Sequence, residues 1–264
     1  MDKIISFKRY ICGYETFDFS ELYRQYDAKK KKLPVNVFLT EHKKYGTILI
    51  NTGCSRFLKH NPVSFAKLIS THNISFTDRD TIDQQLLSEK LDPMVIKKVL
   101  LTHCDPECCG GLKLLPNYEL ISSAQVLALV WLSDPSDGVM PSTLPSGDIP
   151  KSAAGIFKGK SFLSSYFKWI FDVFGDESIL AVDLTGHAKA MTGFYFTEKN
   201  WLIAADASID ETAVTENLIP SDKLLKQQFY PDDYLSVLIT LRRLKREHPE
   251  IRMIFSHSEY VPEI

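Results

Sequence analysis

The chain has 264 residues, of which 44% are hydrophobic, enough to build a substantial buried core. Its 31 basic and 33 acidic residues nearly cancel, so there is no overall field to attract nucleic acid or an anionic membrane. No stretch approaches eighteen apolar residues, so we expect neither a signal peptide nor a membrane span, and we expect a cytoplasmic protein. The one cationic run, residues 29–32 beside Pro34, is interpreted as a solvated loop rather than a nucleic-acid or lipid contact.

The five cysteines are an odd number, and three of them lie within six residues. This pattern does not suit the disulfide framework of a secreted protein, so we expect reduced thiols. Cys12 and Cys54 are interpreted as small core or surface thiols.

The first third of the chain contains two β-rich runs, residues 35–42 and 47–53, joined by the turn-like KKYG. They predict an antiparallel hairpin. Two helices should follow, near residues 62–71 and over residues 83–91, the second with Leu86, Leu87 and Leu91 on one face. A strand ending at Thr102 comes next, and YELISSAQVLALVWL then predicts a strand followed by a helix.

Residues 133–160 are rich in Pro, Ser and Gly and lack a sustained period. We interpret them as a long surface loop, and residues 133–174 as a lid or insertion within a single domain of residues 1–264. An aromatic run lies in this region and favours either a substrate wall or ordinary packing: Phe157, Phe162, Tyr166, Phe167 and Trp169.

The second half contains three β-rich runs, at residues 177–187, 192–198 and 200–206. A helix over residues 232–249 follows and a strand at residues 252–258 closes the series. The helix carries one apolar stripe, made of Leu235, Leu238, Leu241 and Leu244. Each half runs strands first and helix after, which predicts an α+β sandwich with two sheets inside and helices outside.

Side chains that can bind metal follow four separate strands, where a rigid scaffold presents functional groups. Taken singly, each has an ordinary explanation, such as a hydrogen-bonded histidine or a capping aspartate. Their combination favours a metal site. The residues are His103, Asp105, Glu107 and Cys108 in LTHCDPECCGGL, His187 in LTGHAKAMTG, Asp206 in WLIAADAS, and His257 in IFSHSE.

The spacing resembles the signature of the metallo-β-lactamase-fold superfamily, T-H-x-H-x-D-H-x-G-G, which falls without gaps on residues 102–111. ILINTG is similar to the early Asp-Thr-Gly turn of that family, with Asn51 in place of Asp. LTGHAKAMTGFYF, WLIAADAS and FSHS most resemble the branch of N-acyl-homoserine lactonases. The resemblance covers nearly the whole chain and implies a four-layer αββα sandwich.

The motif is altered in this chain. Asp105, Glu107 and Cys108 stand where the family has His, Asp and His, and Ile209 stands where lactonases have Tyr. Each substitute can still bind metal. The resemblance implies a first metal position at His103, Asp105 and His187, a second at Glu107, Cys108 and His257, and a bridge at Asp206. In this register Cys104 and Cys109 face away from the ligands, and we interpret them as packing residues rather than a redox pair.

The altered ligand set changes the charge of the centre. Five His and two carboxylates leave two divalent ions with a net charge of about +2, whereas three His, three carboxylates and a thiolate bring it to about zero. The centre should therefore be a weaker Lewis acid and attract anionic substrates less. These ligand types favour zinc, as one or two ions, with iron or manganese as alternatives.

The resemblance implies a metal-dependent hydrolase of an ester, lactone or thioester. In it, a metal-bound hydroxide positioned by the catalytic residues Glu107 and Asp206 would attack a small-molecule substrate. The lost Tyr makes homoserine lactones a less expected substrate. Two alternatives remain open: a non-catalytic protein with a degenerate or singly occupied site, and a mononuclear iron enzyme acting on a sulfur compound. The chain contains no G-x-S-x-G, P-loop or G-x-G-x-x-G motif.

Overall fold

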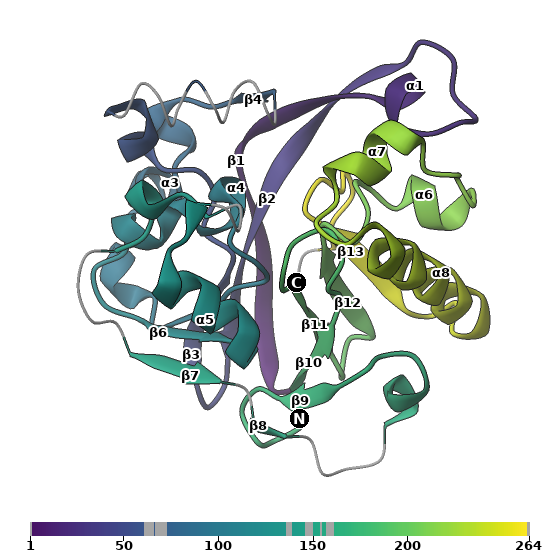
Figure 1. The fold of residues 1–264 in the computed structure, drawn as a ribbon. Helices are drawn as coiled ribbons and strands as arrows, with labels where there is room; N and C mark the ends of the chain where they lie inside the picture. The colour runs from purple at the N-terminus through teal and green to yellow at the C-terminus, as the bar shows by residue number, and fades with distance from the viewer. Residues whose placement is uncertain are drawn as a thin grey trace.

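The computed structural model describes residues 2–60, 66, 73–135, 139–145, 150–153, 155–156 and 161–262. Two β-sheets pack face to face, and helices cover the outer face of each (Figure 1). The first sheet has the order β4-β1-β2-β3-β5-β6-β7 and the second the order β13-β12-β11-β10-β9-β8.

The strands of the first sheet are β1 (Ile4–Asp18), β2 (Lys30–His42), β3 (Gly46–Ile50), β4 (Ile74–Ser75), β5 (Lys98–Leu100), β6 (Glu119–Ser122) and β7 (Lys151–Ala153). Those of the second are β8 (Gly155–Ile156), β9 (Ile170–Asp172), β10 (Ile179–Asp183), β11 (Thr192–Phe196), β12 (Trp201–Ala205) and β13 (Arg252–Phe255). The α-helices are α1 (Phe19–Leu22), α3 (Ile82–Ser88), α4 (Pro106–Cys109), α5 (Ala124–Leu132), α6 (Thr212–Thr215), α7 (Asp222–Gln227) and α8 (Pro231–Glu247).

Buried apolar side chains form one core between the sheets and one beneath the helices on each side. Successive side chains of a strand point to opposite faces of the sheet. In β3, Ile48 and Ile50 therefore lie between the sheets, while Leu49 packs under the helices. In β11, Phe194 and Phe196 likewise lie between the sheets. Both faces of these strands are covered, and the predicted four-layer αββα sandwich is confirmed.

The predicted hairpin is confirmed, because β2 pairs antiparallel with β3. Two details of the first third were predicted wrongly. Leu87 does not share the buried face of Leu86 but is 52% exposed, because one residue turns the helix by about 100°. The lysine run is not simply a loop, because β2 begins at Lys30 and pairs with the outer end of β1. The helix expected near residues 62–71 lies outside the described residues.

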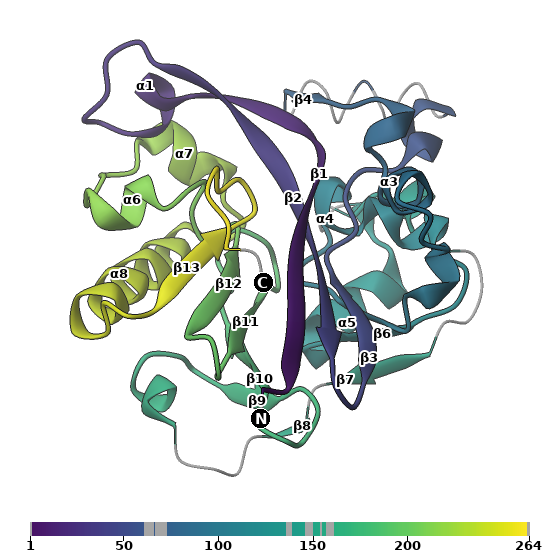
Figure 2. The same ribbon diagram turned by 180° about the vertical axis from the view of Figure 1, so that it is seen from behind.

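A long β1–β2 ribbon extends from the first sheet to α1, which lies beside α7 on the other side of the molecule (Figure 2). This contact brings the outer end of β1 close to the loops of the second sheet. In the second half, α8 turns the predicted leucine stripe toward the second sheet, with Leu238, Leu241 and Leu244 fully buried.

The described parts of residues 133–174 supply β7 to the edge of one sheet and β8 and β9 to the edge of the other. Phe162 and Tyr166 pack around His248, Phe167 is buried beneath the helices, and Trp169 stacks on an aromatic neighbour. These four side chains therefore pack within the protein, as one of the two interpretations of the aromatic run expects. Phe157 lies outside the described residues. No helix in the described part of the chain is long and apolar enough to cross a membrane.

Candidate metal centre

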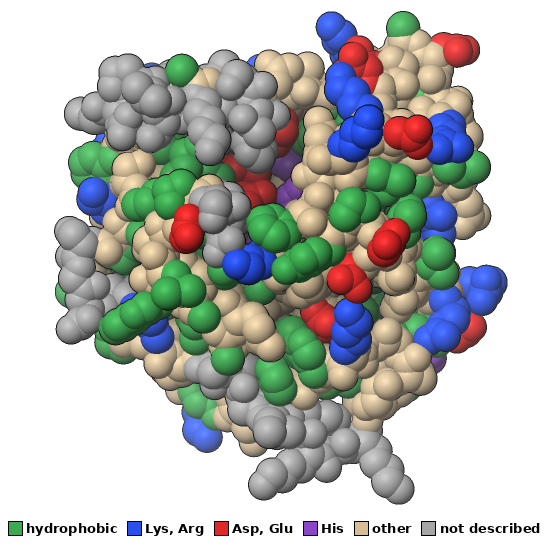
Figure 3. All heavy atoms as spheres, viewed as in Figure 1, with side chains coloured by type: hydrophobic (Ala, Val, Ile, Leu, Met, Phe, Trp, Pro, Cys, Tyr) green, Lys and Arg blue, Asp and Glu red, His purple; other side chains and the backbone are tan. Residues whose placement is uncertain are grey.

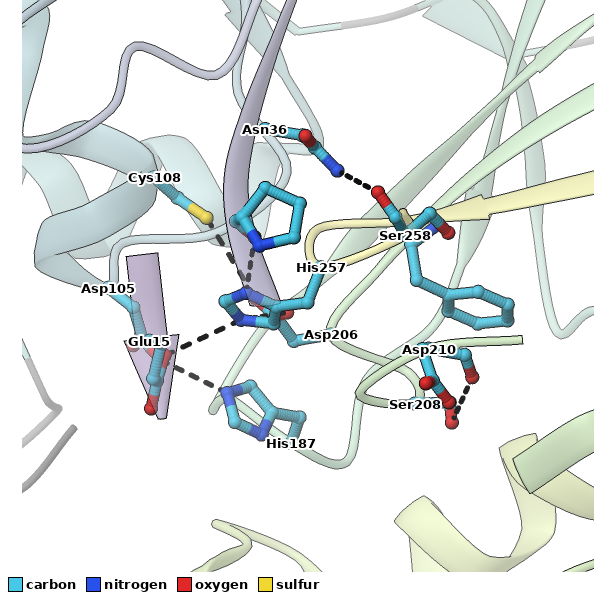
Figure 4. A network of polar contacts seen from close by, with 12 residues as sticks. Glu15, Asn36, Asp105, Cys108, His187, Asp206, Ser208, Asp210, His257 and Ser258 are labelled. Atoms are coloured by element: carbon cyan, nitrogen blue, oxygen red, sulfur yellow. Dashed lines mark hydrogen bonds and ion pairs between the residues drawn. The ribbon is translucent and has the colours of Figure 1, made fainter. Parts of the chain in front are cut away.

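The loops that follow β5, β10, β12 and β13 meet at one end of the two sheets and carry the residues singled out from the sequence. Figure 4 shows the side chains of Asp105, Cys108, His187, Asp206 and His257 directed toward a common centre. Five of the seven predicted ligands are buried, while Asp105 and His187 are half-buried and face the opening. The buried ones are His103, Glu107, Cys108, Asp206 and His257.

One group of possible ligands consists of His103, Asp105 and His187. Nε2 of His187 lies 3.1 Å from Oδ2 of Asp105, and Nε2 of His103 lies 3.5 Å from the same oxygen. The ligand atoms of the three residues are within 4.8 Å of one another, so one cation can contact all of them. This is the set that the sequence predicts for the first metal position.

Asp206 presents its two carboxylate oxygens to different neighbours. Oδ2 lies 3.0 Å from Nε2 of His103 and 3.8 Å from Sγ of Cys108, whereas Oδ1 lies 3.6 Å from Nε2 of His257. A carboxylate in this position can contact cations on both sides, as a bridging ligand does. Sγ of Cys108 lies near ligand atoms of His103 and Asp206, whereas Glu107, Cys108 and His257, the predicted second set, do not form a group of mutually close ligand atoms among the described residues.

Hydrogen bonds fix the tautomer of a neutral His103. The backbone N–H of Thr102 donates to Oδ1 of Asn51 at 3.0 Å, which orients that amide, and the Thr102 hydroxyl donates its single proton to the same oxygen at 2.9 Å. The hydroxyl oxygen therefore accepts from Nδ1 of His103, at 2.9 Å. Nε2 of the neutral ring then carries no proton and offers a lone pair. This atom faces Asp105 and Asp206.

The other two histidines are held in the same way. Nδ1 of His257 donates to the carbonyl oxygen of Pro34 at 2.8 Å. Nδ1 of His187 donates to Oε1 of Gln228 at 3.0 Å, and Nε2 of Gln228 donates to the Leu224 carbonyl at 2.8 Å, which orients the amide. Metal-binding histidines commonly use one ring N–H in this way and offer the other nitrogen to the metal.

The residues present fit a divalent metal. Nε2 of His103 and Oδ1 of Asp206 are buried, and neither makes a hydrogen bond within the described residues. Such orphaned buried polar atoms are rare unless an ion or water serves them. Imidazole nitrogens, carboxylate oxygens and a thiol form the donor set of zinc and related transition metals.

The charges of the metal-free centre are strongly coupled. Burial alone would lower the pKa of His103, but Cys108, Asp105 and Asp206 outweigh burial and raise it well above its usual range. Burial would raise the pKa of Asp206, but His103 and the other imidazoles lower it. Burial raises the pKa of the Cys108 thiol. Without metal, imidazolium–carboxylate pairs therefore hold the site together, and a metal must displace their protons.

Reasoning from the sequence missed Glu15, which belongs to β1 and is only 7% exposed. Its Oε2 lies 3.5 Å from Nε2 of His257 (Figure 4). Burial, and then the nearby carboxylates of Glu107, Asp206 and Asp105, raise the pKa of Glu15 well above its usual range. No local pattern marks this residue, because its neighbours in the sequence read as an ordinary strand.

The Gly-Gly pair of the motif allows α4 to pack directly on the turn after β3. A Cβ at Gly111 would lie 2.2 Å from the Thr52 carbonyl oxygen, so only glycine fits there. The backbone N–H of Gly111 donates to the Gly53 carbonyl, and that of Thr52 to the Cys108 carbonyl. This close contact places Asn51 beside Cys108, where Nδ2 of Asn51 donates to Sγ at 3.4 Å.

A cavity of about 710 Å³ opens onto the centre, a size that suits a small molecule. Figure 3 shows acidic and histidine side chains gathered in a hollow of this face. Asp105, His187 and Glu15 line the cavity, as does Ile209, the residue that replaces the lactonase Tyr. Of the described aromatic residues in 133–174, none lines it, whereas Met140 does.

No protein-family model matches the sequence, and no curated protein matches it either. Solved structures do match. An N-acyl homoserine lactone hydrolase, with the product N-hexanoyl-L-homoserine at its catalytic metal centre, has a TM-score of 0.71 and 16% identity over 98% of this chain and 95% of that chain. A probable metal-dependent hydrolase from Staphylococcus aureus has a TM-score of 0.69 and 14% identity over 100% and 92%.

A third similar structure is AidC, a dizinc quorum-quenching lactonase in complex with a product, with a TM-score of 0.62 and 12% identity over 100% of this chain and 94% of that chain. At such identities the likeness establishes the fold. The chain has the metallo-β-lactamase fold that the motif spacing predicted.

Proposed function

We propose that this chain, as a single domain of residues 1–264, is a metal-dependent hydrolase of a small-molecule ester, lactone or thioester. One observation carries the proposal: three histidines that each donate Nδ1–H to a protein oxygen turn Nε2 toward the carboxylates of Asp105, Asp206 and Glu15. A binding surface without chemistry has no need for this arrangement. The similar structures include hydrolases and lactonases, which favours the same class of reaction.

His103, Asp105 and His187 would hold one metal, with Cys108 nearby and Asp206 reaching toward a second position that includes His257. The thiol and imidazoles favour zinc, with iron or manganese as alternatives. A divalent metal supplies a Lewis acid for the substrate carbonyl and lowers the pKa of water.

The chain's own residues orient the reactants. Asp206 is placed to position the attacking water, because its Oδ1 makes no hydrogen bond within the described part of the chain, and Glu107 is the second candidate for this role. Ile209 lines the cavity and has no hydroxyl to donate to the substrate. We take residues 133–174 to form part of the substrate wall or lid, because Met140 lines the same cavity.

The test is hydrolysis by the full chain, stripped of metal and then reloaded with Zn²⁺, against a panel of esters, lactones and thioesters. His103→Ala and Asp105→Asn should lower kcat/KM by at least about 100-fold, since each removes a side chain of the metal centre. His248→Gln, at the far aromatic cluster, should leave it unchanged. Metal content below about a tenth of an equivalent, with no gain in thermal stability on adding zinc, manganese or iron, would reject the proposal.

A further inference from the structure

Glu15 reaches the metal centre from a strand that carries none of the motif residues (Figure 4). Its backbone is fixed on both sides, because Glu15 pairs with Leu33 of β2 and with Ile74 of β4. Its side chain is 9% exposed, and Oε2 lies 3.5 Å from Nε2 of His257. The sheet therefore builds this carboxylate into the site.

Nε2 of His257 faces two carboxylates at once. The ring donates Nδ1–H to the Pro34 carbonyl oxygen, so Nε2 of the neutral ring carries a lone pair. Oε2 of Glu15 lies 3.5 Å from this atom, and Oδ1 of Asp206 lies 3.6 Å from it. Asp206 is buried, and its Oδ1 makes no hydrogen bond within the described residues. A lone pair set against carboxylate oxygens is unfavourable unless a proton or a metal cation lies between them.

The two separations measured from His257 match those of ligand atoms that share a cation. Two ligand atoms, each bound at ~2.1 Å to a tetrahedral zinc, lie about 3.4 Å apart. The nitrogen–oxygen distances from His257 to Glu15 and to Asp206 are close to that value. They are also at or beyond the upper limit of a hydrogen bond.

We propose that Glu15 is a metal ligand, and that it shares the second cation position of the centre with His257. The inference rests on the proposed function only in taking the centre to bind metal. It adds a ligand from β1 to a set that the sequence places entirely on the loops after β5, β10, β12 and β13. It also adds one negative charge to the centre, which reduces its attraction for anions.

The test is calorimetric titration of the metal-stripped full chain with Zn²⁺, together with metal analysis after dialysis. The wild type should bind two equivalents. Glu15→Gln preserves the shape of the side chain but removes its charge and one ligand oxygen. In this variant the first equivalent should bind unchanged and the second at least about tenfold more weakly. Glu15→Asp keeps the charge on a shorter stem and should weaken the second equivalent less than Glu15→Gln.

Glu41→Gln is the matched control, because Glu41 is an exposed residue of neighbouring β2. It should bind two equivalents with wild-type affinities. Circular dichroism and thermal unfolding of the stripped variants check that each is folded. Two equivalents with wild-type affinities in Glu15→Gln, or a single equivalent in the wild type, would overturn the inference. Two equivalents without hydrolysis of any substrate would instead count against the proposed function and leave Glu15 as a ligand.

Discussion

Nδ2 of Asn51 donates a hydrogen bond to Sγ of Cys108 at 3.4 Å. Both residues of this contact depart from the motif of the family that the chain resembles, which has Asp where this chain has Asn51 and His where it has Cys108. An amide N–H stabilises a thiolate, whereas a carboxylate beside it would repel it. The two replacements are therefore chemically matched, which favours a thiolate that binds metal over a residue lost by drift.

Asn51→Asp should weaken zinc binding by about 10-fold to 100-fold, the usual effect of losing a hydrogen bond to a ligand. The variant keeps the oxygen that accepts from Thr102, and it replaces the donor to sulfur with a carboxylate oxygen that repels the thiolate. The measurements are Zn²⁺ affinity and the thiolate absorption band of the Co²⁺-loaded protein, which should weaken. Asn117→Asp, on an exposed turn, is the control. Equal affinity and an equal band in both variants would show that the contact has no role.

The layers of the fold could be predicted from the sequence because strand periodicity and element order are local signals. The seven candidate ligands could be identified because they follow strand ends with a recognisable spacing. Glu15 could not, since its burial depends on pairing with strands distant in the sequence. The predicted burial of Leu87 was wrong for a related reason. A helix of two turns has too few residues for its periodicity to show which leucines face inward.

Gly186→Ala should destabilise the protein. A Cβ at Gly186 would lie 2.5 Å from the backbone N of Tyr234, in the first turn of α8. The Tyr230 N–H also donates to the Gly186 carbonyl, so the loop cannot easily move away. Overpacking of this kind costs about 1–3 kcal/mol, and the positive φ of Gly186 adds strain. Urea unfolding of the metal-stripped protein measures the loss.

Gly175→Ala separates crowding from backbone strain. Gly175 also has a positive φ, but a Cβ there would meet nothing within 4 Å. This variant should lose only about 1 kcal/mol, the usual strain of a non-glycine residue in that conformation. An equal loss in the two variants would contradict the proposed close contact between Gly186 and α8.

His42 predicts a pH dependence of stability away from the metal centre. Its Nδ1 accepts from the backbone N–H of Lys44 and of Tyr45, so Nε2–H donates to Oγ of Ser178, at 3.1 Å. Burial lowers the pKa of His42, although Asp176 opposes the shift. The unfolded chain therefore takes up a proton first as the pH falls below about 6.5, and the free energy of unfolding declines by up to about 1.4 kcal/mol per pH unit.

The contribution of His42 is complete above that pH and is lost on acidification. Urea unfolding at several pH values should show the slope in the wild type, and His42→Gln should reduce it. His103 and His187 have raised pKa values and change stability in the opposite sense. Both are present in the two proteins, so the difference between the two slopes reports on His42 alone. Identical slopes would mean that His42 is not held neutral.

Zinc uptake should release protons. The strongly raised pKa values of Cys108 and His103 mean that these two groups are protonated in the metal-free protein near neutral pH. Zn²⁺ affinity should therefore fall between about pH 8 and about pH 6, and the heat of binding should vary with the ionisation enthalpy of the buffer. Cys108→Ser should release about one proton fewer. A binding heat that is the same in all buffers would contradict this picture.

The charge of the loaded centre predicts which substrates it accepts. With Glu15 included, a thiolate and four carboxylates oppose the four positive charges of two divalent ions, which leaves a net charge of about −1. Lys30 and Lys223 line the cavity, but Asp18 and Glu21 line it too and Lys223 pairs with Glu21, so the lysines add little compensation. An acetyl ester should therefore be hydrolysed with a kcat/KM at least about tenfold higher than the succinyl ester of the same alcohol, whose free carboxylate is repelled. Glu15→Gln should narrow this difference, and equal rates on the two esters at low salt would contradict the charge count.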